Sequence, residues 1–98
     1  MILRVIIRGA ARAEFESDAE YYEQRRTGLG REFVSEIHDA ISSAALHPER
    51  FPAVRGVVRR IGARRFPYSV LYRVRGTTLE VLAIFHSSRN PIIWQRRI

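Results

Sequence analysis

The pattern of hydrophobic and polar positions predicts a strand and two helices in the first half of the chain. Residues 2–7 are mostly β-branched and end before a glycine, which is typical of a strand buried on both faces. Apolar residues then recur at helical spacing over residues 11–26 and again from Leu29 onward. The second helix is expected to stop at or before His47, because Pro48 disfavours helix in the residue before it. The short connection between the two segments predicts an antiparallel helix hairpin.

The second half of the chain has the composition of strands. Runs rich in Val, Ile, Leu, Tyr and Phe, separated by glycines, predict strands at residues 57–61, 68–74 and 78–85. Residues 48–56 are expected to form a connector, and residues 90–98, which contain Trp94, a short helix or docked tail. We therefore predict an α+β fold: an N-terminal strand, the helix hairpin, a three-stranded antiparallel meander in one sheet, and a short C-terminal helix or tail.

The turn between the last two predicted strands fixes how they pair. A turn at residues 76–77 places Arg73 opposite Glu80, a favourable cross-strand charge pair, and His86 opposite Pro67. Side chains alternate between the two faces of a sheet. One face is thus expected to be apolar and to pack on the helix hairpin; it consists of Phe66, Tyr68, Val70, Tyr72, Val74, Leu79, Val81, Ala83 and Phe85.

The opposite face of this sheet holds the candidate site. Arg65 and His86 are expected at one end of it, as diagonal neighbours within side-chain reach of each other. Arg60 on the preceding strand and Arg89 just after His86 are expected to join them. The centre of that face is apolar and consists of Leu71, Leu82 and Ile84.

Charge is divided unevenly along the chain. The net charge is +7, and every basic residue is arginine. Residues 1–49 hold six Arg and nine acidic residues, whereas residues 50–98 hold eleven Arg and a single acid, Glu80. A basic face of this strength predicts a polyanion or an acidic protein as partner.

Length and composition narrow the class of protein. A chain of 98 residues with 46% hydrophobic and 28% charged residues is expected to form one globular domain over residues 1–98. The absence of cysteine excludes disulfides and thiolate zinc sites, and His38 and His47 lack metal-site spacing, so we expect no metal. No glycine-rich phosphate loop occurs, and no cofactor is expected. The chain shows no signal peptide or spanning segment, which predicts a cytoplasmic protein without membrane contact.

Several motifs are shared with a known group of bacterial proteins. The most specific are Arg-Phe-Pro-Tyr at residues 65–68 and His-x-x-Arg-x-Pro-x-x-Trp at residues 86–94. Further matching parts are Ala19-Glu20-Tyr21-Tyr22, Leu29-Gly30-Arg31-Glu32-Phe33, Pro48-Glu49-Arg50-Phe51-Pro52, Arg59-Arg60-Ile61 and Arg97. With these motifs the whole chain resembles the RelE/ParE superfamily of toxins from type II toxin–antitoxin systems, and its ParE branch more than its mRNA-cleaving RelE branch.

The resemblance implies one fold and two alternative activities. The fold is a strand, a helix hairpin and an antiparallel sheet, covered by a cognate antitoxin encoded beside the toxin. ParE-like toxins bind DNA gyrase and trap it on broken DNA, whereas RelE-like toxins cleave mRNA in the ribosomal A site. With either activity, the toxin is expected to meet operator DNA only indirectly, through the antitoxin. The basic face expected to serve the activity consists of Arg60, Arg65, Arg89 and Arg97.

Proton-transfer chemistry favours the ParE-like alternative. Arginine keeps its proton at working pH, so it can bind phosphate but cannot act as a general base. His86 is the candidate proton shuttle, and the nearest acid on its face, Glu80, lies about 20 Å away along the strand. We therefore expect a gyrase poison. The alternative is a ribosome-dependent mRNA endoribonuclease in which His86 is the acid or base and Arg65 assists.

Each candidate residue also has a simpler interpretation. His86 can merely end a strand and bond to the backbone, and Trp94 can be a lid on the core rather than a stacking platform. A basic domain that binds nucleic acid without toxicity is a third alternative. It is the least favoured, because the tyrosines of the predicted sheet lie on its core face rather than exposed for stacking.

Overall fold

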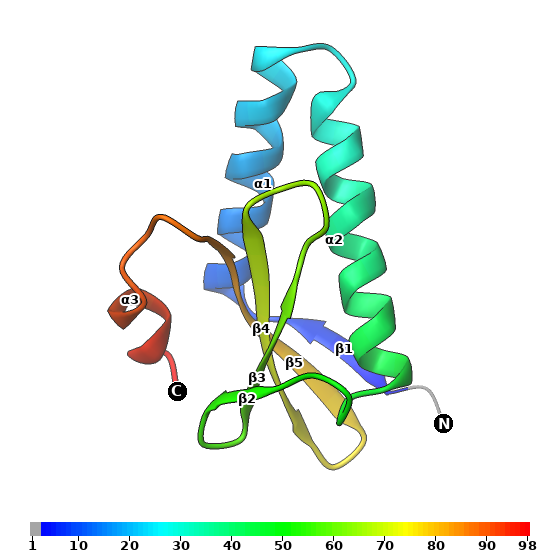
Figure 1. Cartoon of the computed structure of the whole chain (residues 1–98), viewed down its shortest axis with the longest axis vertical. Coiled ribbons are helices and arrows are strands. Elements are labelled where there is room, and N and C mark those ends of the chain that lie inside the picture. Colours follow the sequence, from blue (N-terminus) through cyan, green and yellow to red (C-terminus); the bar gives the residue numbers. More distant parts are fainter. Residues whose placement is uncertain (1–2) are drawn as a thin grey trace.

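Two long helices lie against one face of a five-stranded sheet (Figure 1). The computed structural model describes residues 3–98. Its elements, in chain order, are β1 (Arg4–Ile7), α1 (Gly9–Arg25), α2 (Leu29–Leu46), β2 (Ala53–Arg55), β3 (Val58–Gly62), β4 (Tyr68–Arg75), β5 (Thr78–His86) and α3 (Ile92–Gln95). The strand order is β1-β5-β4-β3-β2, with β1 parallel to β5 and the other neighbours antiparallel. The predicted α+β class, helix hairpin and meander are confirmed.

The helix hairpin forms along the apolar stripes that its sequence predicts. Phe33 of α2 is fully buried, and Phe15 and Tyr22 of α1 pack against it with ring centroids 5.9 and 5.2 Å away. The two helices approach closely at Gly30, where an added Cβ would lie 2.6 Å from the carbonyl oxygen of Ala19. A residue with a side chain at this position would therefore push the helices apart.

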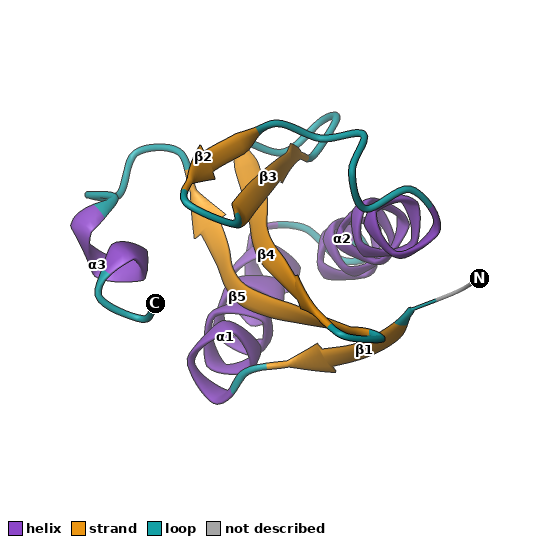
Figure 2. Ribbon diagram, turned by 90° about the horizontal axis from the view of Figure 1, so that it is seen from below, coloured by secondary structure: helices purple, strands orange, loops and turns teal. Residues whose placement is uncertain are grey.

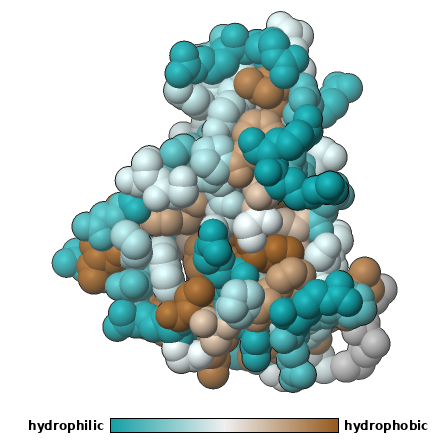
Figure 3. Space-filling view, in the orientation of Figure 1, coloured by the Kyte–Doolittle hydropathy of each residue, from teal (hydrophilic) through white to brown (hydrophobic). Residues whose placement is uncertain are grey.

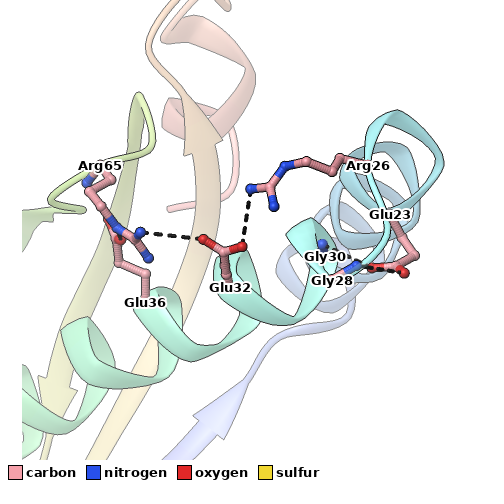
Figure 4. A network of polar contacts seen from close by, with 7 residues as sticks. All are labelled: Glu23, Arg26, Gly28, Gly30, Glu32, Glu36 and Arg65. Atoms are coloured by element: carbon pink, nitrogen blue, oxygen red, sulfur yellow. Dashed lines mark hydrogen bonds and ion pairs between the residues drawn. The ribbon is translucent and has the colours of Figure 1, made fainter.

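A single carboxylate closes the turn between the helices (Figure 4). Glu23 accepts hydrogen bonds from the backbone N–H groups of Gly28 at 3.0 Å and Gly30 at 3.1 Å. Gly28 has a φ of +90°, a left-handed conformation that favours glycine. These contacts satisfy backbone donors at the start of α2 that have no partner within the helix.

The first strand is an edge strand, which corrects the expectation that it is buried on both faces. It pairs only with β5, and Val5 and Ile6 are 39% and 43% exposed. A run of β-branched residues is therefore compatible with an edge as well as with a sheet interior. The start of the predicted strand at Ile2 lies outside the described residues.

The second strand was missed by the sequence analysis, which predicted a connector over residues 48–56. β2 has three residues, all of them exposed, and it pairs irregularly with β3. A strand this short that buries none of its residues leaves no alternation of apolar and polar positions to recognise. It adds a fifth strand to the sheet and forms the edge opposite β1.

A β-bulge in β5 corrects the predicted register. The pairing of residues 72–75 with residues 78–81 is confirmed, including the Arg73–Glu80 pair. Beyond this point Leu71 pairs with Ala83, so Leu82 is an extra residue in β5. Such a residue shifts every later position by one along the partner strand.

The bulge also moves side chains to the other face of the sheet. Ile84 belongs to the core under the helices, while Ala83 and Phe85 belong to a second cluster, which is the reverse of the prediction. His86 lies opposite Tyr68 instead of Pro67, with the two rings 5.0 Å apart. The predicted geometry at the end of β5 was therefore wrong.

The face of the sheet turned away from α1 and α2, called here the open face, has its own small core. The C-terminal helix α3 covers part of this face and stands apart from α1 and α2 (Figure 2). Trp94 is only 6% exposed there, which confirms its predicted role as a lid; it packs with Val58, Leu71, Leu82, Ala83 and Phe85. No helix within residues 3–98 has the length and apolar character needed to cross a membrane.

Candidate functional site

A groove of about 340 Å³ lies on the open face between the β2–β3 hairpin and α3. Its apolar lining comes from Leu71, Phe85 and Trp94. Three of the predicted site residues, Arg60, His86 and Arg89, also line it. On the face drawn in Figure 3, hydrophobic atoms form separate patches divided by hydrophilic ones, and one patch lies at the left, where α3 is. The groove therefore combines a small apolar floor with charged walls.

Arg60 is held over the sheet by its neighbour on β4. It pairs with Leu71 across the strands, which places its side chain on the open face. Its Nε donates a 2.7 Å hydrogen bond to the hydroxyl of Ser69, which is itself buried. This bond uses one of the five guanidinium N–H groups, so the remaining donors of Arg60 can serve a ligand.

The other two arginines near the groove are anchored by Glu14 of α1. The Glu14 carboxylate accepts two hydrogen bonds from Arg97, at 2.9 and 3.0 Å, and one from Arg89 at 2.9 Å. Its side chain is 9% exposed, whereas those of Arg97 and Arg89 are 20% and 40% exposed. Arg89 also lies over the ring of Phe85, 5.0 Å from its centroid. Arg97 is thus largely a structural cation, and Arg89 is the more accessible of the two.

The same carboxylate covers the part of β5 that extends beyond β1. β1 ends beside Val81, so the next residues of β5 have no neighbouring strand on that side. Glu14 accepts a hydrogen bond from the N–H of Ile84 at 3.1 Å, and Arg97 donates one to the carbonyl of Leu82 at 3.1 Å. The contacts of Glu14 with Arg89, Arg97 and Ile84, called here the Glu14 clasp, therefore fasten the tail to an otherwise open sheet edge.

His86 is hydrogen-bonded to Ser88 through one ring nitrogen. Its Nδ1 accepts a hydrogen bond from the backbone N–H of Ser88 at 3.0 Å and lies 2.7 Å from the Ser88 hydroxyl. Because a backbone N–H can only donate, Nδ1 carries no proton, and the neutral ring bears its hydrogen on Nε2. His86 is therefore arranged as a hydrogen-bond donor through Nε2.

An acidic residue near His86 comes from a helix and was missed by the sequence analysis. Burial raises the pKa of Asp18 on α1, against the opposing effect of a hydrogen bond with the Tyr68 hydroxyl and of the nearby Arg89 and His86. Burial, together with Asp18, raises the pKa of Tyr68 as well. Strand alternation reveals only acids within the sheet. The available signal was the spacing of Asp18 from Glu14, which puts both on one side of α1.

Arg65 is not at this site, which corrects the expectation that it neighbours His86 on the open face. Its side chain forms ion pairs with Glu36 at 3.1 Å and Glu32 at 3.3 Å, both on α2 (Figure 4). Glu36 also accepts hydrogen bonds from the backbone N–H groups of Arg65 and Phe66. Arg65 thus fastens the β3–β4 connection to the helix hairpin.

The groove offers hydrogen-bond donors and an apolar floor to an anionic group. It offers the guanidinium groups of Arg60 and Arg89, the Nε2–H donor of His86 and an apolar floor. Within residues 3–98, no three His, Asp or Glu side chains gather in a way that could hold a metal ion. The chemistry of this surface is therefore recognition of charge beside an apolar contact.

The order of elements and the match to a family model define the class of protein. A strand, a helix hairpin and an antiparallel sheet with a basic open face are the features of the RelE/ParE superfamily of toxins. The family model described as "ParE toxin of type II toxin-antitoxin system, parDE" matches residues 5–91. The chain belongs to this ParE toxin family.

Solved structures of toxin–antitoxin systems share the fold. One, titled as the chromosomal ParDE system of P. aeruginosa, has a TM-score of 0.73 and 19% identity, over 87% of this chain and 96% of that chain. Another, titled as the toxin–antitoxin complex RelBE2 of Mycobacterium tuberculosis, has a TM-score of 0.58 and 22% identity, over 88% and 99% of the two chains. A comparison with curated proteins finds no match.

Proposed function

We propose that this chain is a ParE-type toxin that acts on DNA gyrase and is held inactive by a cognate antitoxin. The observation that carries the proposal is the match of residues 5–91 to the ParE toxin family. Gyrase is the target that a resemblance to the ParE branch implies, whereas the RelE branch implies mRNA cleavage. The chemistry of the groove supports the first of these.

The proton arrangement of His86 supports a role without catalysis. Cleavage of RNA through its 2′-hydroxyl needs a general base with a free acceptor in reach of that hydroxyl. The Nδ1 atom of His86 already accepts from Ser88, and Nε2 carries the hydrogen. Arginine cannot accept a proton, so Arg60 and Arg89 do not replace it. The groove is suited to bind a protein surface or an anion.

Among the predicted basic residues, Arg60 and Arg89 are the ones we assign to contact with gyrase. Both line the groove and keep guanidinium donors that face solvent. Arg97 positions the tail through the Glu14 clasp. Arg65 belongs to the contact with α2.

The antitoxin is expected to cover positive charge. Both named structural relatives come from two-component toxin–antitoxin systems, which supports a cognate partner for this chain. The open face and its groove are basic and partly apolar, so an acidic segment with apolar side chains complements them. Covering the groove would also block access of gyrase to Arg60 and Arg89.

A gyrase supercoiling and cleavage assay tests the proposal. Purified toxin, separated from its antitoxin, is expected to inhibit supercoiling and to increase linear DNA. The double variant R60Q/R89Q is expected to be about tenfold less potent, because arginines at the centre of an interface each contribute on the order of 1 kcal/mol or more. The matched control R25Q/R31Q, at the helix turn, is expected to keep full potency.

A second variant separates the two activities. H86A is expected to leave gyrase inhibition within about threefold, whereas a nuclease would lose roughly 10² to 10⁴ in rate without its acid or base. Folded wild-type protein that leaves gyrase unaffected but cleaves mRNA on ribosomes, with loss of cleavage in H86A, would contradict the proposal.

A further inference from the structure

The open face carries more positive charge than its own carboxylates neutralise. Glu14 and Glu80 are the acids that contact the arginines of this face, and both are largely buried. Seven arginines lie on the face or at its border, and we call them the arginine strip: Arg8, Arg55, Arg60, Arg73, Arg75, Arg89 and Arg97. Seven arginines and two carboxylates leave a net charge of +5 on one side of the molecule.

Several of these arginines are accessible. Arg55 at the β2–β3 turn is exposed, and no carboxylate in the described part of the chain binds it. The side chains of Arg8 and Arg75 touch Glu80 but are 50% and 65% exposed. In contrast, Arg73 is 8% exposed and already pairs with Glu80 inside the sheet. The exposed guanidinium groups keep free donors for an anionic partner.

The arginine strip is long. Arg75 pairs with Thr78 at one end of β5, and Arg89 follows the other end of that strand. Nine residues of extended strand span about 26 Å. Duplex DNA rises about 3.4 Å per base pair, so this length corresponds to about eight base pairs of phosphate backbone. A partner with regularly repeated negative charge matches such a strip.

The open face lacks the exposed aromatic side chains on which the bases of single-stranded nucleic acids stack. Phe85 and Trp94 on this face are 5% and 6% exposed. Among the aromatic side chains that the structure describes, only Tyr21 on α1 is exposed, at 50%. Binding of single strands relies on bases stacked on exposed aromatic rings. The strip therefore fits a backbone whose bases are already stacked in a duplex.

We propose that the arginine strip binds the phosphate backbone of duplex DNA directly and without sequence preference. The inference does not depend on gyrase being the target, since it follows from the charge and length of the face. Its contacts are ionic, so its affinity falls steeply with salt. If gyrase is the target, this surface would also hold the DNA segment that gyrase presents.

Fluorescence anisotropy with a labelled 12-base-pair duplex and free toxin tests the inference. The variant R8Q/R55Q/R75Q leaves Arg60 and Arg89 in place, and Arg73 still pairs with Glu80. It is expected to bind the duplex at least about tenfold more weakly at 0.1 M salt. Its slope of log affinity against log salt is expected to be smaller by up to about 2.7, at roughly 0.9 per lost phosphate contact.

A control of equal net charge separates a strip from general basicity. R25Q/R26Q/R31Q removes three arginines at the end of α1, in the turn and at the start of α2, and is expected to bind DNA like the wild type. R55Q alone, which loses no ion pair, checks that a weaker affinity does not reflect misfolding. Equal binding by the strip and control variants would overturn the inference. Tighter binding of single-stranded RNA or of polyglutamate than of the duplex would overturn it as well. The anisotropy assay contains no gyrase, so its outcome does not depend on whether gyrase is the target of the toxin.

Discussion

At the scale of single residues, Glu80 is a carboxylate held by three arginines. It contacts Arg8 at 2.8 Å, Arg73 at 3.0 Å and Arg75 at 3.4 Å. The hydrogen bond from Arg73, outweighing burial and joined by Arg8, holds the pKa of Glu80 below its usual value. The single acid of the second half of the chain thus keeps the buried Arg73 neutralised.

E80Q is expected to lower the free energy of unfolding by about 3 kcal/mol, because it leaves the buried Arg73 without its counter-charge. Urea unfolding at pH 7 measures the difference. E16Q, on the exposed side of α1, serves as the control and is expected to change stability by less than about 0.5 kcal/mol. Similar urea midpoints for E80Q and E16Q would show that the fold tolerates a buried Arg73 without a counter-charge.

Glu36 makes stability depend on pH. Burial raises its pKa, but hydrogen bonds from the backbone and side chain of Arg65 and the backbone of Phe66 outweigh this, so its net pKa lies below 4.5. A carboxyl with a lowered folded-state pKa stabilises the fold above its unfolded value of 4.5, and this stability is lost as pH falls through the folded value.

E36Q is therefore expected to be less stable than the wild type at pH 7, with a difference that shrinks as pH falls below about 4.5. The melting temperatures of wild type and E36Q, measured between pH 7 and pH 3, report this difference in stability. Glu80 titrates in the same direction, so both proteins lose stability in acid. A gap between wild type and E36Q that stays constant over the whole range would contradict the prediction.

At the scale of elements, the C-terminal tail depends on a residue from the other end of the sequence. Glu14 binds Arg89 and Arg97, which lie 75 and 83 residues away along the chain. Trp94 anchors the same segment in the apolar cluster of the open face. The tail therefore stays in place through the ionic contacts of Glu14 and the apolar contact of Trp94.

E14Q is expected to loosen the tail without unfolding the helix hairpin. Removing the charge of a buried hydrogen-bonded group costs about 1 to 3 kcal/mol, here locally. The amides of Arg96 and Arg97, bonded to the carbonyls of Ile92 and Trp94, should then exchange about tenfold faster or more. Exchange within α2 is expected to stay unchanged. Equal exchange rates in the tail of both proteins would mean that Trp94 alone holds it.

The elements were largely predictable, but the geometry at the site was not. Helical periodicity located α1 and α2, since Phe15 and Tyr22 recur on one side of α1, and Phe33, Ile37 and Ile41 on one side of α2. The turn at residues 76–77 fixed the register near the β4–β5 turn, and the Arg73–Glu80 pair supported it. The extra residue at Leu82 left no mark in the pattern, because Leu82, Ala83 and Ile84 are all apolar. The prediction assumed strict alternation along β5 and therefore placed the side chains after Leu82 on the wrong face of the sheet.

The surroundings of the candidate residues also depended on contacts between elements. Arg60, His86 and Arg89 line the same groove, because β4 separates β3 from β5 by one strand and Arg89 follows the end of β5. Arg65 was misplaced because its partner, Glu36, lies on a helix. Long-range ion pairs of this kind have no periodic signal, so strand alternation alone could not reveal them.

At the scale of the whole molecule, the uneven charge of the sequence becomes a difference between two faces. Most acids of the first half lie on α1 and α2, where Glu32 and Glu36 bind Arg65. The arginine strip lies on the open face of the sheet. The charges are thus separated in space as well as along the chain, which orients an approaching charged partner.

Association with an acidic antitoxin is expected to be fast at low salt and to slow markedly with rising ionic strength, since charges steer encounter over a Debye length of about 10 Å at 0.1 M salt. Stopped-flow mixing of toxin with its antitoxin between 20 and 500 mM salt measures the rate constant. R8Q/R55Q/R75Q should associate more slowly at low salt and converge with the wild type at high salt. R25Q/R26Q/R31Q, with the same net charge, should follow the wild type. If both variants slow equally, net charge and not its placement governs the encounter.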